Sequence, residues 1–102
     1  MTLTSELKQI IYEVAQASTV QSLAPLSKEE LLRGLRLCVA SEGEAIDLYS
    51  KLSEACEDPK VKEILDDVTR EEKIHVGQFL EAIKILDSNE YKLYLKGQEE
   101  MK

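Results

Sequence analysis

Two carboxylates and the sole histidine of the sequence fall at positions where apolar residues are expected. From about residue 28 to residue 56, apolar side chains recur at helical spacing, but Glu42 interrupts this stripe near its centre. A second stripe, from about residue 59 to residue 86, is interrupted by Glu72 and His75. Their Glu-x-x-His spacing places both side chains on one face of a helix. These three residues are therefore the first candidates for chemistry.

Charged groups within an apolar face need compensation, because burying an isolated charge costs several kcal/mol. No Lys or Arg shares the stripes at this level: Arg33 and Arg36 lie about a turn and a half or more toward the N-terminus, and Lys73 lies on another face. A bound cation is the natural compensation. Oxygen-rich ligation with one imidazole suits iron, or manganese or another divalent metal, better than structural zinc, which prefers cysteine.

The three candidates also share one height if the two helices form an antiparallel hairpin. Residue 57 is midway between Glu42 and Glu72, and the sequence Glu57-Asp58-Pro59 is typical of a turn. Each glutamate is then about 15 residues, or ~22 Å, from the turn, with His75 one helical turn further along. The spacing therefore predicts that the three side chains converge.

Capping signals mark the ends of these helices. Ser27 and Glu30 form a capping box, and Asp58 with Pro59 can begin the second helix. Because no strand-like alternation is present, the sequence predicts an all-α protein. The expected elements are a short helix over 5–17, a linker over 20–26, long helices over 28–56 and 59–86, and a short helix over 90–100. We expect three parts: an N-terminal helix and linker (1–26), a hairpin with the metal ligands (27–87), and a C-terminal helix and tail (88–102).

One hairpin supplies only half of a known ligand set. Di-metal carboxylate sites in ferritin-like bundles take a Glu from each of two helices and Glu-x-x-His from each of the other two. The chain has one His, and its flanking helices are too short to supply a second set. Two hairpins packed about a two-fold axis would give four Glu and two His around two metals. We therefore expect the hairpin to dimerise into a ferritin-like four-helix bundle.

The residues resemble those of the encapsulated ferritins. The resemblance covers roughly residues 28–87 without a gap and rests on three stretches: Ser41-Glu42-Gly43-Glu44-Ala45-Ile46-Asp47-Leu48-Tyr49, Asp58-Pro59, and Arg70-Glu71-Glu72-Lys73-Ile74-His75. It implies a di-iron ferroxidase centre at a dimer interface, with Glu42, Glu72 and His75 as ligands and Glu72 as the bridge. It also implies that Tyr49 donates hydrogen bonds near the ligands.

The resemblance carries further expectations about metal uptake and assembly. Family members hold an outer metal-uptake site of two acidic residues, of which Glu44 matches one while Ser41 replaces the other, so this outer site should be weakened or absent. The family forms rings of dimers, such as a decamer, and works inside an encapsulin shell that stores the iron mineral. Some relatives are fused to the shell protein, and the tail over residues 94–102 is not a clear shell-docking peptide.

Composition excludes several other classes. With 20 Asp and Glu against 13 Lys and Arg, a net charge of −7 and 5% aromatic residues, the chain lacks the basic surface and stacking platform of a nucleic-acid binder. No apolar run approaches a membrane span, and the N-terminus does not resemble a secretory signal, so we expect a cytoplasmic protein. Cys38 and Cys56 lie 18 residues apart in one expected helix, about 27 Å, which is too far for a disulfide.

Two other functions remain open at this stage. The buried polar residues of a non-catalytic helical oligomerisation module would specify helix register, and such a protein would need no metal. A rubrerythrin-like peroxide reductase would use similar ligands but draws electrons from a Cys₄ iron site, which two cysteines on one helix cannot provide.

Overall fold

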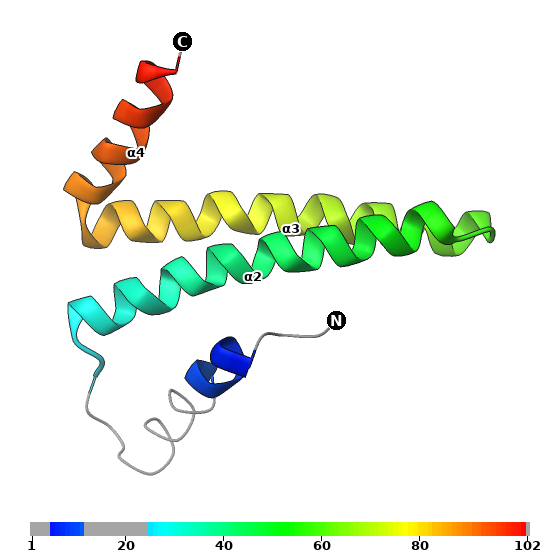
Figure 1. Ribbon diagram of the computed structural model, residues 1–102, viewed down its shortest axis with the longest axis horizontal. Coiled ribbons are helices and arrows are strands. Elements are labelled where there is room, and N and C mark those ends of the chain that lie inside the picture. The colour runs from blue at the N-terminus through cyan, green and yellow to red at the C-terminus, as the bar shows by residue number, and fades with distance from the viewer. Residues whose placement is uncertain (1–4, 12–24, 102) are drawn as a thin grey trace.

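The computed structural model describes residues 5–11 and 25–101, and within these ranges the chain is helical without a strand. After helical residues 5–11, three helices follow: α2 (Lys28–Ala55), α3 (Pro59–Leu86) and α4 (Ser88–Glu100) (Figure 1). This arrangement confirms the predicted all-α class. The remainder of the expected N-terminal helix and the first part of the linker, residues 12–24, lie outside the described residues. No helix in the described part has the length and apolar character needed to cross a bilayer.

Helices α2 and α3, each of 28 residues, form the predicted antiparallel hairpin (Figure 1). The capping box at the start of α2 is present, since the Ser27 amide donates to Glu30 and the Glu30 amide donates to Ser27, each at 3.1 Å. Asp58 caps α3 by accepting from the amides of Lys60 and Val61, with Pro59 at the first helical position. The structure therefore confirms both helix caps that the sequence predicted.

The predicted ends of two helices need correction. Helix α2 ends at Ala55, one residue early, with Cys56 as its C-cap. Helix α4 begins at Ser88 rather than residue 90. The reason is that Asp87 is the N-cap, accepting from the Glu90 amide at 3.1 Å, so Ser88 belongs to the first turn and not to a break.

The hairpin alone leaves one apolar edge of α3 open. The buried apolar residues of the described chain are few: Leu7, Leu32, Ala45 and Ile83. Val61, Ile64 and Val68 follow one edge of α3 at spacings of three and four residues, and Ile64 is 62% exposed. A row of large exposed apolar side chains is typical of an interaction surface.

Helix α4 turns away from the end of α3 and is tied back to α2 (Figure 1). The Arg36 guanidinium donates from Nε at 3.0 Å and from Nη2 at 2.5 Å to the Glu90 carboxylate, and the Tyr94 hydroxyl donates to the same group. These hydrogen bonds, that from Arg36 first, lower the pKa of Glu90 to about 2. The direction of α4 is therefore set by a charge pair between residues 54 positions apart.

This pair should make the attachment of α4 sensitive to acid. Because the pKa of Glu90 is lowered from 4.5 to about 2 in the folded chain, its contribution is present above pH 4.5 and is lost as pH falls toward 2. In urea unfolding of the metal-free protein, Glu90→Gln should lower the midpoint at pH 7. The difference in urea midpoint between this variant and the wild type should be smaller at pH 3. The exposed Glu81→Gln is the control, and a gap that stays constant with pH would contradict this account.

Both cysteines are free, as the sequence predicted. Burial raises the pKa of the Cys38 thiol, which keeps it protonated and poorly nucleophilic. The Cys56 thiol donates to the carbonyl of Asp58 at 3.4 Å across the turn. Neither the environment of Cys38 nor the hydrogen bond of Cys56 indicates a redox role.

Candidate metal centre

The three candidate residues meet at the middle of the hairpin. Glu42 comes from α2, and Glu72 and His75 come from α3. One ligand atom from each lies within 4.8 Å of the other two. His75 Nδ1 is 3.8 Å from Glu42 Oε1 and 3.8 Å from Glu72 Oε2. One cation could therefore contact all three side chains after small rotations.

Antiparallel helix direction explains how Glu42 reaches His75. Each Cα–Cβ bond in a helix tilts toward that helix's N-terminus. Glu42 therefore leans away from the turn, whereas His75, one helical turn higher on α3, leans toward it. Their side chains meet between the two levels, as the 3.8 Å contact shows.

Glu42 carries the strongest sign of a missing positive charge. Its side chain is 15% exposed and that of Glu72 is 17% exposed. Glu42 Oε2 is buried without a hydrogen-bond partner. Among the residues that the structure describes, no Lys or Arg forms an ion pair with either carboxylate. A buried carboxylate oxygen without a partner is costly, and a hard or borderline cation would satisfy it.

His75 marks the open side of this site. Its side chain is 42% exposed, and it continues the apolar edge formed by Val61, Ile64 and Val68, seven residues beyond the last of them. The carboxylates are thus enclosed by the hairpin, while the imidazole faces the surface that one chain leaves uncovered.

Comparisons with known proteins identify the family of this chain. A family model described as EncFtn-like matches residues 18–95. The chain belongs to the EncFtn-like family. The crystal structure of the encapsulated ferritin domain from Pyrococcus furiosus superposes with a TM-score of 0.72 at 40% identity, over 81% of this chain and 85% of that one.

Two curated relatives of this EncFtn-like chain are also similar in sequence. The ferritin-like-encapsulin shell fusion protein of Pyrococcus furiosus is 44% identical over 78 residues, which is 76% of this chain and 23% of that protein. The encapsulin nanocompartment cargo protein EncC of Myxococcus xanthus is 36% identical over 74 residues, 71% of this chain and 57% of that protein. The chain thus spans about a quarter of the first relative and somewhat more than half of the second.

Other residues expected at the site lie outside the three-residue group. Glu44 is half-buried on α2 and is not part of the group of potential ligands found among the described residues. Tyr49, two turns beyond Glu42, is also half-buried. Roles for Glu44 in metal uptake, for Tyr49 in hydrogen bonding and for Glu72 as a bridge stay predictions.

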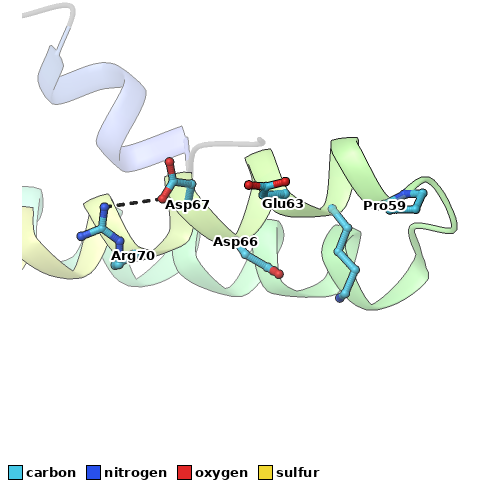
Figure 2. A pocket seen from close by; sticks show the side chains of 6 residues that line it. Pro59, Glu63, Asp66, Asp67 and Arg70 are labelled. Atoms are coloured by element: carbon cyan, nitrogen blue, oxygen red, sulfur yellow. Dashed lines mark hydrogen bonds and ion pairs between the residues drawn. The ribbon is translucent and has the colours of Figure 1, made fainter.

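A polar link across the hairpin was missed at the sequence level. Ser53 is buried in the last turns of α2, where its hydroxyl donates to Asp66 and accepts from Lys62 of α3. The available signal was a serine within an apolar stripe. Nearby, a shallow hollow on α3 contains Asp66 and the exposed Arg70–Asp67 ion pair, and it holds none of the candidate ligands (Figure 2).

Proposed function

We propose that this protein is a ferroxidase that oxidises Fe(II) to Fe(III) at a di-iron site shared between two protomers. The observation that carries the proposal is the convergence of Glu42, Glu72 and His75 around a buried carboxylate oxygen that has no partner. Membership of the EncFtn-like family supports iron as the metal.

Sharing between protomers follows from the ligand count. Two carboxylates and one imidazole complete only half of a di-iron carboxylate site. A second hairpin laid antiparallel on the apolar edge of α3 would cover Val61, Ile64 and Val68 and bring its own three ligands. The two hairpins together would form a four-helix bundle. The family resemblance further implies that such dimers assemble into a ring, such as a decamer.

The ligands can favour oxidation by charge. Two substrate Fe(II) ions each lose one electron to dioxygen or peroxide, and the four carboxylates of the pair stabilise the higher charge of Fe(III). Glu72 would bridge the two ions, and His75 would supply the nitrogen ligand of each half. Tyr49 would orient a ligand by a hydrogen bond, and Glu44 would attract incoming cations. Because Ser41 stands where the family pattern has a second acidic residue, the outer metal-uptake site would be weakened or absent.

The setting proposed for this chemistry is an encapsulin nanocompartment. One similar protein is named as a fusion to an encapsulin shell and another as an encapsulin cargo protein. By analogy, this chain would act inside a shell, where iron is detoxified by oxidation and stored as Fe(III).

Anaerobic Fe(II) titration tests whether the site is shared. Metal-free protein should be largely monomeric, and Fe(II) should drive dimers, because ligands from two chains gain by meeting. At about 100 times the dissociation constant, binding should add about 2.7 kcal/mol of stability. Sedimentation velocity and thermal unfolding follow both effects.

Two variants complete that titration. His75→Ala should lose the iron response, whereas Glu81→Gln, which replaces an exposed glutamate on the same helix, should keep it. If Fe(II) leaves both the oligomeric state and the melting temperature of the wild type unchanged, the shared site does not exist. A protein that assembles fully in chelator would instead be an oligomerisation module.

A further inference from the structure

A single buried serine makes the hydrogen bonds that join α2 to α3. Ser53 is 4% exposed, and its hydroxyl donates to Asp66 Oδ1. Lys62 Nζ donates to Ser53 Oγ at 2.9 Å and to the Ser53 carbonyl at 3.1 Å. Over residues 25–101, no other hydrogen bond connects these two helices. The hydrogen bonds between α2 and α3 are therefore confined to Ser53, close to the turn, since the Glu42–His75 contact at 3.8 Å is too long for a hydrogen bond.

Apolar packing alone does not define the register of two such helices. Stripes of Leu, Val and Ile interlock again when one helix slides along the other by a turn. That slide is about 5.4 Å. It exceeds the 4.8 Å span of the three ligand atoms, so Glu42 would leave the group. Buried polar contacts disfavour these slipped registers, because sliding the helices leaves the polar groups unpaired.

We propose that Ser53, acting through Asp66 and Lys62, is a positioning residue that fixes the register of α2 against α3 and so holds Glu42 level with Glu72 and His75. The inference rests on the proposed function, in that the three residues are taken as metal ligands. Ser53 itself touches none of them: it lies 11 residues, or about 16 Å, along α2 from Glu42.

Thr69 offers a matched control on the same hairpin. It is also buried, but its hydroxyl donates to the Leu65 carbonyl of its own helix at 2.7 Å. Thr69→Val therefore removes a buried hydroxyl without removing a contact between helices. Comparison with Ser53→Ala separates loss of register from loss of stability.

Co(II) binding is the first readout, because its affinity and visible spectrum depend on the number and geometry of ligands. Ser53→Ala and Asp66→Ala should weaken Co(II) binding roughly 10- to 100-fold and alter the spectrum. Asp66→Asn retains an acceptor for the Ser53 hydroxyl and should restore both. Thr69→Val should bind like the wild type even where its melting temperature falls as far as that of Ser53→Ala. Equal Co(II) affinity in Ser53→Ala and Thr69→Val would overturn the inference.

A second readout needs no metal. With both native cysteines replaced by serine, spin labels are attached through Ala40→Cys and Glu63→Cys, at exposed positions on α2 and α3. The distance distribution should be narrow with Ser53 and should broaden or shift by several ångströms with Ser53→Ala. An unchanged distribution would refute the register role. If the wild type bound no Co(II), the proposed function would fail, while this measurement would still decide the inference.

Discussion

Glu42→Gln is expected to slow Fe(II) oxidation in air by roughly 100-fold, toward the rate of iron in buffer. The amide keeps the size of the side chain but removes the charge that would attract a cation to the buried Oε2 atom. His75→Ala should have a comparable effect, because it removes the proposed nitrogen ligand of the site. The initial rate at equal protein and iron concentrations, followed by the absorbance of Fe(III), checks both variants.

The control for this loss is again Glu81→Gln, which changes the net charge by the same amount away from the site. Its rate of Fe(II) oxidation should match that of the wild type, because a surface carboxylate away from the site attracts iron without binding it where it is oxidised. Equal rates for the wild type, Glu42→Gln and His75→Ala would end the ferroxidase assignment. Slow oxidation in all three, including the wild type, would do the same.

A second expected result is a reversal of stability with metal. In chelator, Glu42→Leu should be more stable than the wild type by about 1–3 kcal/mol, because a buried carboxylate oxygen without a partner is replaced by apolar atoms. With anaerobic Fe(II) at about 1,000 times the dissociation constant, the wild type gains about 4.1 kcal/mol and should overtake the variant.

Urea unfolding at fixed protein concentration measures this reversal, with sedimentation run in parallel because dimer formation also stabilises. Ala45→Val is the companion variant: it adds apolar volume at a buried position one turn from Glu42 and leaves the carboxylate in place. It should respond to iron as the wild type does. A Glu42→Leu protein that is less stable than the wild type in chelator would show that the carboxylate is satisfied without metal.

The fold was largely predictable because its ends and faces are set by local rules. Ser27 and Asp58 cap the starts of the two long helices with their own side chains, and the apolar stripes predict the helices themselves. The convergence of the three candidate ligands was predictable for a related reason. Glu42 and Glu72 break those stripes at equal distances from the turn, and the hairpin geometry brings them together.

Features that depend on side-chain direction across helices were not predictable in this way. The pairing of Arg36 with Glu90, which sets the direction of α4, joins residues that no periodicity connects. The link from Ser53 to Asp66 likewise requires the relative rotation of two helices. The early start of α4 was missed because Asp87 and Ser88 are both capable caps, and only the hydrogen bond to the Glu90 amide distinguishes them.

The position of the ligands along the helices has one more consequence. Glu42 has 14 residues of α2 before it and 13 after it, while Glu72 has 13 residues of α3 before it and 14 after it. A two-fold axis through the proposed ligands would therefore pass through the midpoint of both helices. Two hairpins related by that axis would overlap along their entire length with no overhang, so the alignment that would complete the proposed metal site would also maximise contact between the chains.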